Sequence, residues 1–486
     1  MNLKALIRSS AVYTFGNLIN RGTGFLLLPI YTRYLLPQDY GTMELIDMVI
    51  NIAGMLFGMN ALGNSMIRVY HEYSDQKERE SVIFTAIISI LFISILMFII
   101  GSFASPFLSH KILGNSSMYT LFMLSFLAII FGNQVEMSLT YLRIQDKPAP
   151  FVIYSYLQVL GLIGFNVFFI VYMKLGIFGF IYSKLICMGL GSVFLGYLVV
   201  NRLHKRFHWQ ALKKMVRFGL PLVGATLAFF IIHFSDRFFL SKYGTLADVG
   251  IYSLGYKFGF LITYLVGEPF GRAWNARLFS HVGEEGWKIY FSKVFSLLVI
   301  ALSFACTIIG FFSGDLLRIM VSGPFRTAAI IIPGVAFGYV LREIGDFFRE
   351  ILFINHKTGS VTKIAILSAV LNLILNYFLI QKWGMMGAMY STMATWLLYA
   401  LFLLILSQRE FSIPYKMKGA FPLFIIICIG FYFARKFDAF SLPFSILGHG
   451  ILVIPILLGY WFLGFLDSEQ KEFIVTKLKW KSKSIP

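Results

Sequence analysis

The sequence alternates between long apolar runs and short polar segments. Most of these runs reach the roughly 20 residues that an α-helix needs to cross the hydrocarbon core of a bilayer. The breaks coincide with turn and charge clusters such as Pro37-Gln38-Asp39 and Gln145-Asp146-Lys147-Pro148. This pattern predicts an all-α polytopic membrane protein with about 14 transmembrane helices. The expected spans are 9–34, 42–66, 81–108, 117–142, 150–173, 176–200, 218–241, 248–270, 289–313, 326–348, 360–381, 385–407, 419–434 and 443–466.

Composition supports a lipid-facing exterior. The 486 residues are 58% hydrophobic and only 13% charged, whereas soluble proteins carry roughly 25% charged residues. The first apolar run follows Lys4 and Arg8 but is too long for a signal sequence and lacks an Ala-x-Ala-like exit. We therefore expect it to be retained as a membrane helix.

The net charge of +19 bears on topology rather than on nucleic-acid binding, because the basic residues occupy short loops instead of one clustered face. Most Lys and Arg fall in cytoplasmic segments when the N-terminus is placed in the cytoplasm, as the positive-inside rule expects. The basic segments 202–217 and 471–483 dominate this bias, and we expect them to contact anionic lipid. An even number of spans then places both termini in the cytoplasm.

The chain also repeats itself with an offset of about 204–210 residues. Such a shared offset indicates an internal duplication of a six-span unit, in which both copies have the same orientation. Two lobes around a central cavity are the expected arrangement. The predicted domains are an N-terminal lobe (1–205), a C-terminal lobe (206–412) and two additional helices with a basic tail (413–486). The matching segments are Arg33-Tyr34 with Arg237-Phe238, Asp39-Tyr40-Gly41 with Asp248-Val249-Gly250, Lys147 and Asn166 with Lys357 and Asn376, and Lys174-Leu175-Gly176-Ile177-Phe178-Gly179 with Lys382-Trp383-Gly384-Met385-Met386-Gly387.

These motifs resemble the oligosaccharide (polysaccharide biosynthesis) flippases of the multidrug/oligosaccharidyl-lipid/polysaccharide exporter superfamily. The resemblance covers nearly the whole chain. It rests on Phe15-Gly16-Asn17, Leu28-Pro29-Ile30-Tyr31-Thr32-Arg33-Tyr34-Leu35 and Asp39-Tyr40-Gly41, on Asp236-Arg237 with Asp248-Val249-Gly250-Ile251-Tyr252-Ser253, and on Leu371-Asn372-Leu373-Ile374-Leu375-Asn376 with Gly384-Met385-Met386-Gly387-Ala388.

The resemblance implies a multi-pass protein of the bacterial inner membrane that moves polyprenyl-diphosphate-linked O-antigen, capsule or exopolysaccharide units from the cytoplasmic to the periplasmic leaflet. It also implies a polysaccharide polymerase or assembly proteins as partners. Two alternatives stay open, namely a cation-coupled multidrug exporter and a flippase for the peptidoglycan lipid precursor. Drug exporters of this superfamily usually stop at 12 spans, which counts against the first alternative.

No sequence motif supports covalent chemistry. The chain contains no Gly-x-x-x-x-Gly-Lys-Ser/Thr, no Gly-x-Ser-x-Gly and no His-Glu-x-x-His. We therefore predict a transporter rather than an enzyme, without an organic cofactor or a metal centre. Its energy source would be the substrate gradient or a coupling ion, Na⁺ or H⁺.

Charged residues inside the predicted spans are the candidate site residues, because a charge at mid-bilayer costs roughly 2.5–3.5 kcal/mol. Arg21 lies near the middle of the first span and shares a helix face with Asn17. A guanidinium can grip diphosphate oxygens bidentately, so Arg21 and Asn17 are predicted to bind substrate; an inter-lobe salt bridge is the alternative for Arg21. Lys257 and Lys184 are further candidates, with pairing to Glu268 and snorkelling as their respective alternatives.

The remaining candidates bear on substrate, coupling or gating. Arg237 matches Arg33 in the repeat, and a structural anchor beside Asp236 is favoured over substrate binding. Glu44 and Asp47 lie on a polar face of the second span, where they can bind Na⁺ or H⁺, close a gate, or simply form a polar helix end. Glu136 lies deeper and alone. Arg342 and Asp346 form an i,i+4 pair in a self-balancing cluster, for which a lobe-closing network is favoured over substrate binding.

Overall fold

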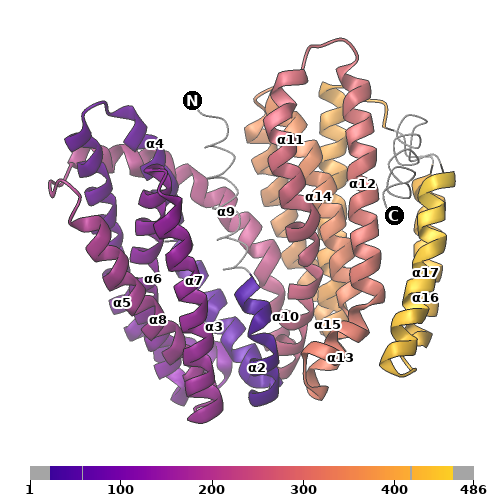
Figure 1. The fold of residues 1–486 in the computed structure, drawn as a ribbon, viewed down its shortest axis with the longest axis horizontal. Helices are drawn as coiled ribbons and strands as arrows, with labels where there is room; N and C mark the ends of the chain where they lie inside the picture. The colour runs from indigo at the N-terminus through magenta and orange to yellow at the C-terminus, as the bar shows by residue number, and fades with distance from the viewer. Residues whose placement is uncertain (1–21, 57–58, 416–418, 464–486) are drawn as a thin grey trace, which may run out of the picture. The chain divides into compact units, whose positions relative to one another are not determined.

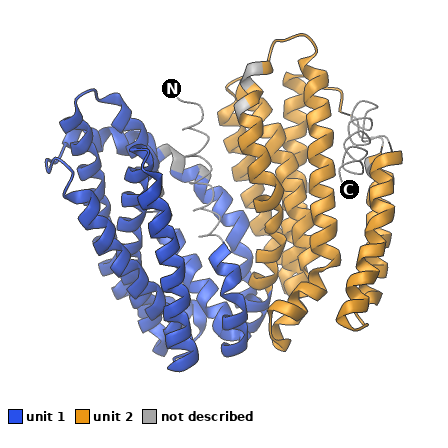
Figure 2. Cartoon of the chain, viewed as in Figure 1, with its two compact units in different colours: residues 1–251 blue, residues 252–486 orange. Residues whose placement is uncertain are grey.

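In the computed structural model, residues 22–56, 59–415 and 419–463 are described, and they fold into helices joined by short connections. The chain forms two compact units, residues 1–251 and residues 252–486 (Figure 2). Each unit is described by itself below, with the helix labels of Figure 1.

Unit 1 is built from long helices that pack side by side. The helix α5 lies against α6, α8 lies against both α6 and α7, and α9 packs on α3, α4 and α5. Its elements are α2 (Leu28–Tyr34), α3 (Pro37–Leu56), α4 (Met59–Glu72), α5 (Gln76–Leu113), η1 (Ser116–Met118), α6 (Tyr119–Ile144), α7 (Pro148–Asn166), the π-helix η2 (Val167–Tyr172), α8 (Ile177–Val200), α9 (Trp209–Tyr243) and the beginning of α10 (Leu246–Gly259).

Unit 2 is centred on α14, which packs on α12 and most extensively on α15. The C-terminal pair α16–α17 lies against α12 and α13 (Figure 1). Its elements after α10 are the π-helix η3 (Thr263–Gly267), α11 (Glu268–His281), α12 (Trp287–Phe311), α13 (Ser313–Met320), η4 (Gly323–Ile330), α14 (Ile332–Ile354), α15 (Thr358–Glu410), α16 (Ala420–Phe437) and α17 (Leu442–Phe462).

The all-α membrane fold is confirmed. Within the described ranges, eight helices are long and apolar enough to cross a bilayer, and the bent pair η4–α14 would make a ninth. Every predicted span from 42–66 onward overlaps a helix, and the first span, 9–34, is described only from residue 22. The predicted span 326–348 is shifted, because Gly323–Ile330 forms a 3₁₀-helix and α14 starts at Ile332, one residue before Pro333, with a bend of 47°.

The backbone supports the predicted repeat at the matching Lys-x-Gly segments. Gly176 has φ 56° and ψ −133°, and Gly384 has φ 53° and ψ −128°. This conformation is essentially restricted to glycine, so the two copies share an unusual backbone turn as well as a similar sequence. In the second copy this turn lies inside α15, where two predicted spans, 360–381 and 385–407, meet.

The compact units and the predicted domains follow different criteria. The units divide between Ile251 and Tyr252, whereas the sequence repeat begins its second copy near residue 206. The reason lies in α9, which belongs to the second copy but packs on α3, α4 and α5 of unit 1. The division at residues 205 and 412 remains a prediction about duplication.

Candidate functional site

The eighth predicted span is not a regular helix. The α-helix α10 ends at Gly259, a π-helical turn occupies Thr263–Gly267, and α11 begins at Glu268. Pro269 explains the interruption, because proline lacks the amide hydrogen that an α-helix would use and its ring displaces the carbonyl four residues earlier. Such π-turns often mark functional sites.

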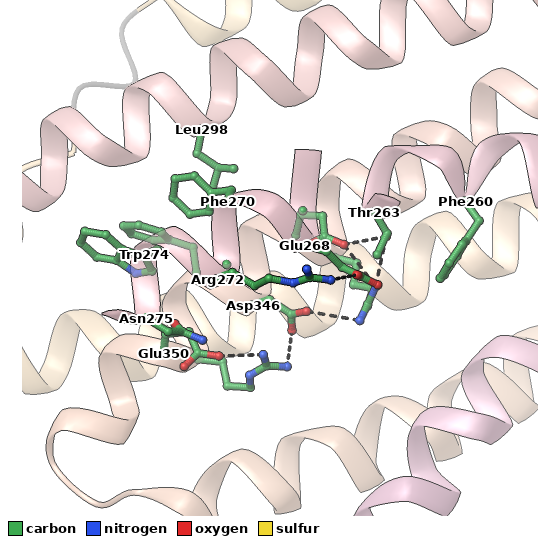
Figure 3. Close-up of a pocket in the computed structure, with 16 residues that line it drawn as sticks. Phe260, Thr263, Glu268, Phe270, Arg272, Trp274, Asn275, Leu298, Asp346 and Glu350 are labelled. Atoms are coloured by element: carbon green, nitrogen blue, oxygen red, sulfur yellow. Dashed lines mark hydrogen bonds and ion pairs between the residues drawn. The ribbon is translucent and has the colours of Figure 1, made fainter. Parts of the chain in front are cut away.

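A cavity of about 380 Å³ lies beside this π-turn in unit 2 (Figure 3). The first wall comes from η3 and α11, and the second comes from the polar face of α14. Its lining is Phe260, Thr263, Gly267, Glu268, Phe270, Gly271, Arg272, Trp274, Asn275, Leu298, Arg342, Glu343, Asp346, Phe347, Arg349 and Glu350.

The polar wall on α14 is a continuous chain of ion pairs. Arg342 Nη1 lies 3.1 Å from Glu343 Oε1, and Arg342 Nη2 lies 3.4 Å from Asp346 Oδ2. Arg349 approaches Asp346 at 2.6 Å and Glu350 at 2.8 Å. These five side chains are mostly buried, so their mutual attraction is weakly screened. Asp346 is the link between the two arginines.

Groups from other helices complete this network. Thr263 of the π-turn donates a hydrogen bond to Glu343 Oε1 at 2.7 Å and accepts one from Arg342 Nη1 at 3.2 Å. Tyr399 of α15 donates to Asp346 Oδ1 at 3.0 Å. Gly267 contacts the Glu343 carboxylate so closely that a Cβ there would overlap it. The network therefore ties the irregular turn of the eighth span to α14 and α15.

The charges around the cavity do not cancel completely. Four carboxylates, those of Glu268, Glu343, Asp346 and Glu350, meet three guanidinium groups, those of Arg272, Arg342 and Arg349. Arg272 pairs with Glu268 at 3.1 Å, on the α11 side (Figure 3). With one carboxylate in excess, the cavity is suited to a small cation or a proton rather than to an anion.

In unit 1 the structure brings two candidates together. Lys184 Nζ of α8 lies 2.7 Å from Asp47 Oδ1 of α3, with the two side chains 35% and 37% exposed. Asn51 lies one turn beyond Asp47 and donates to its carbonyl oxygen at 2.6 Å. Glu44, one turn before Asp47, is partly buried on the same helix. The pair joins two of the predicted coupling and substrate residues across helices that are far apart in sequence.

The interpretation of Glu136 as a lone carboxylate was wrong. Arg143, seven residues later on α6, reaches back two turns and pairs with its Oε1 at 2.5 Å, while also donating to Thr140. Both side chains are largely exposed in the structure. The long arginine side chain makes this contact possible at a spacing that sequence rules for helix pairs do not include.

The other candidates are distributed as follows. Arg237 is almost fully buried, pairs with Asp236 at 2.8 Å and donates to the carbonyl oxygen of His233, which agrees with the structural anchor that the sequence favoured. Lys257 is partly buried on α10. Its suggested partner Glu268 pairs with Arg272.

Arg21 and Asn17 lie outside the described residues, so their predicted role in substrate binding stays a prediction. The central cavity between the two predicted lobes also remains a prediction.

Sequence reasoning found the Arg342–Asp346 pair but missed the cavity that this pair lines. Thr263 and Gly267 are uncharged and give no signal by themselves. Pro269 inside the predicted span 248–270 was the available clue, because a proline within a span interrupts the helix and frees backbone and side chains to line a cavity.

Comparison with known proteins places these features in context. Residues 6–275 match a family model described as polysaccharide biosynthesis protein. The fold is similar to that of the lipid II flippase MurJ in an inward closed conformation (TM-score 0.70, 14% identity, 93% of this chain and 99% of that chain). It is also similar to an inward-facing multidrug resistance MATE family transporter of the MOP superfamily (TM-score 0.67, 16% identity, 81% and 94%). A MOP superfamily transporter from Pyrococcus furiosus is more distant (TM-score 0.51, 14% identity, 84% and 94%).

At these identities the structural likeness establishes the fold alone. A sequence search of curated proteins finds no match.

Proposed function

We propose that this chain, which belongs to the polysaccharide biosynthesis protein family, moves polyprenyl-diphosphate-linked oligosaccharide units from the cytoplasmic to the periplasmic leaflet by alternating access. The observation that carries the proposal is the family match over residues 6–275. The fold adds support, because it is similar to that of a lipid II flippase.

Physical chemistry favours a buried cation for holding such a cargo. A diphosphate carries about two negative charges, and an arginine near mid-bilayer can bind its oxygens bidentately. Arg21 is the sequence's best candidate, with Asn17 on the same helix face. The polyprenyl tail would stay in lipid while the sugars pass through the aqueous interior. No bond in the cargo is made or broken.

The network in unit 2 suits the coupling step. Glu343 and Asp346 share Arg342, and Thr263 touches both Glu343 and Arg342. A proton or Na⁺ that neutralises Glu343 or Asp346 competes with Arg342 for the same oxygens. Cation binding would therefore weaken the contact between the π-turn and α14. A contact that alternates between a closed and an open state is what alternating access requires.

The proposal is tested by deleting the gene in its own organism and restoring it on a plasmid. We expect loss of surface polysaccharide and accumulation of cytoplasmic-leaflet lipid-linked units, both reversed by the wild-type gene. The Arg21→Ala variant should fail to restore polysaccharide at an unchanged protein level. The matched control Arg326→Ala, at an exposed arginine of η4, should restore it fully. Normal surface polysaccharide in the deletion strain would contradict the function, and full restoration by Arg21→Ala would remove Arg21 from the mechanism.

Export of small cationic compounds is a second candidate, and the excess carboxylate around the unit 2 cavity favours it. The same strains distinguish the two functions. An exporter predicts greater sensitivity of the deletion strain to cationic dyes with normal surface polysaccharide. A flippase for the peptidoglycan precursor predicts a failure of cell-wall synthesis instead.

A further inference from the structure

An apolar groove lies between α16 and the rest of unit 2. It encloses about 320 Å³, and its lining comes from α12, α14, α15 and α16. Phe337 of α14 and Phe424 of α16 contact each other with ring centroids 5.7 Å apart, so these two helices meet through long side chains. The α16 side of the groove is open, because Phe424 is 46% exposed and Cys428 is exposed. A molecule in the surrounding lipid can therefore reach the groove.

The groove offers almost no polar partner to an occupant. Among the described residues that line it, only Ser303 has an oxygen atom in its side chain. That hydroxyl already donates to the carbonyl oxygen of Val299 at 2.6 Å and lies 2.8 Å from the Tyr460 hydroxyl. A buried water molecule needs several polar partners, and a sugar needs more. The occupant that gains most from this lining is therefore a hydrocarbon chain.

The length of the groove matches one leaflet of a bilayer. Its wall on α14 extends from Pro333 to Ile344, which is about 16 Å along a helix that rises roughly 1.5 Å per residue. Each leaflet contributes about half of the roughly 30 Å hydrocarbon core. One extended fatty acyl chain of a bilayer lipid therefore fits along the groove.

A small polar cavity of about 90 Å³ adjoins the groove. Pro333 and Phe431 line both, whereas Arg435 and Asp438 line the small cavity alone. Pro333 lies in the first turn of α14, and Asp438 directly follows α16. The cavity therefore lies where α14 begins and α16 ends, which the predicted topology places at the external face. An amphiphile whose chain lies in the groove would have its head group here.

The two charged side chains of this small cavity have free bonding capacity. Arg435 is exposed and donates to the carbonyl oxygen of Ile330 at 3.3 Å, and no carboxylate of the described residues hydrogen-bonds to it. Asp438 Oδ1 is buried without a hydrogen-bond partner. The ring Nε2 of His449 stays 3.9 Å from this oxygen and lies 3.0 Å from the carbonyl oxygen of Ala434. Because an unpaired buried acceptor is costly, a ligand that presents both an anion and a hydrogen-bond donor fits this pair.

We propose that the groove and the small cavity together bind one zwitterionic phospholipid with a primary ammonium group, phosphatidylethanolamine. One acyl chain occupies the groove, and the phosphate accepts hydrogen bonds from Arg435. The ammonium donates to the carboxylate of Asp438, whose side chain is 34% exposed. Phosphatidylglycerol has no cation for Asp438, and the choline head group has no N–H to donate. The bound lipid would fill the space between α16 and α14. This inference stands independently of which cargo the protein moves.

The test measures lipid retention by full-length protein purified in a mild detergent. The protein is incubated with an equimolar mixture of phosphatidylethanolamine, phosphatidylglycerol and phosphatidylcholine with identical acyl chains, and mass spectrometry of the intact complexes identifies the bound lipid. We expect one phosphatidylethanolamine per chain, preferred about tenfold over each of the other two, which is the effect of one charge-assisted hydrogen bond. This lipid should also raise the thermal midpoint of unfolding.

Substitutions in the small cavity separate the two head-group contacts. Asp438→Asn should reduce the preference for phosphatidylethanolamine over phosphatidylcholine to about twofold or less. Arg435→Gln should weaken the binding of all three lipids by about tenfold. Lys436→Gln is the matched control, because it removes the same charge from the next residue, which is exposed and does not line the cavity. This variant should retain lipids as the wild type does.

Two tryptophan variants test the acyl-chain contact. Cys428→Trp fills the groove from its open side, so it should lose the bound lipid and the rise in thermal midpoint. Ile429→Trp adds the same ring at a neighbouring exposed position outside the groove lining, and it should keep both.

The proposal is overturned if folded wild-type protein retains no phospholipid or retains all three equally. It is equally overturned if Arg435→Gln, folded as judged by its thermal midpoint without added lipid, binds phosphatidylethanolamine with unchanged affinity. Retention of a polyprenyl-linked lipid instead, lost in Cys428→Trp, would also overturn it by assigning the groove to the cargo.

Discussion

Gly41 and Gly250 meet at a reciprocal contact between two helices. A Cβ on Gly41 would overlap the carbonyl oxygen of Leu246 and lie 3.0 Å from the amide nitrogen of Gly250. A Cβ on Gly250 would overlap the carbonyl oxygen of Pro37 and lie 2.9 Å from the amide nitrogen of Gly41. The same 209-residue offset relates Pro37 to Leu246 and Gly41 to Gly250. The two copies of the repeat therefore meet through equivalent residues, as in a two-fold symmetric contact.

The turns before these glycines are equivalent as well. Asp39 accepts a hydrogen bond from the amide of Leu36 at 3.0 Å, and Asp248 accepts one from the amide of Thr245 at 2.9 Å. Each aspartate thus satisfies a free amide at the start of its helix. The Asp-x-Gly motif combines a helix start with a close backbone crossing, which explains why it is present in both copies.

Substitution Gly41→Ala should separate the helices at this crossing. The new methyl group meets backbone atoms that cannot rotate away, so we expect a loss of about 1–3 kcal/mol of stability and a lower thermal midpoint of the detergent-purified protein. Gly250→Ala should have a similar effect. The double variant should lose less than the sum, because both substitutions separate the same pair of helices.

Gly164→Ala is the control for this pair. Gly164 lies inside α7 with open space where a Cβ would be, so alanine there should leave stability unchanged or raise it by about 0.5–1 kcal/mol. Equal thermal midpoints for Gly41→Ala and Gly164→Ala would show that the crossing is not as tight as described.

Much of this fold could be predicted from the sequence because the signals are local. Apolar length predicts the spans, and the repeated Lys-x-Gly segment indicates an internal duplication, which the shared backbone conformation of Gly176 and Gly384 supports. The bends could not be placed so well. Pro333 lies in the first turn of α14 rather than interrupting it, because the residues before the helix, Gly323–Ile330, adopt a 3₁₀-helix instead of an α-helix.

The candidate site was only partly predictable. Arg342 and Asp346 are one helical turn apart, so their pairing follows from the sequence. Contacts between elements do not follow from spacing, and this applies to Lys184 with Asp47 and to Thr263 with Glu343. Contacts of that kind depend on which helix faces which, and that choice is made by the whole packed unit.

Gly267→Ala should disturb the unit 2 cavity specifically. The added methyl group overlaps the Glu343 carboxylate, which must turn away and lose its hydrogen bond from Thr263. Because a side chain rather than the backbone moves, we expect a modest stability loss of about 1–2 kcal/mol. Transport should fall much more strongly, about tenfold or beyond, in proteoliposomes that report the leaflet of a fluorescent lipid-linked oligosaccharide.

Gly359→Ala, at the start of α15 and outside the cavity lining, meets no atom within 4 Å. This control should transport at the wild-type rate. If Gly267→Ala also transports normally, the contact between the π-turn and Glu343 has no part in the cycle.

Neutral variants of the two shared carboxylates should change the cation dependence of transport. Glu343→Gln and Asp346→Asn keep the shape of the network but remove the charge that a proton or Na⁺ would neutralise. We expect transport by these variants to lose its response to an imposed Na⁺ or pH gradient, measured in the same proteoliposomes. Glu284→Gln, at an exposed loop position, should respond like the wild type. A normal gradient response in both neutral variants would place coupling elsewhere.

The Asp47–Lys184 pair offers a charge-exchange experiment in unit 1. The two side chains are about one-third exposed, so the pair should add only about 0–1 kcal/mol to stability, and either Asp47→Lys or Lys184→Asp should leave a folded protein. Each single variant replaces the attraction across this contact with repulsion between like charges, and we expect it to block transport if this contact opens and closes during the cycle. The exchanged double variant restores attraction and should recover a substantial part of the rate. Recovery of transport distinguishes a working contact from two residues that each bind cargo alone, because in the latter case the exchange would remain inactive.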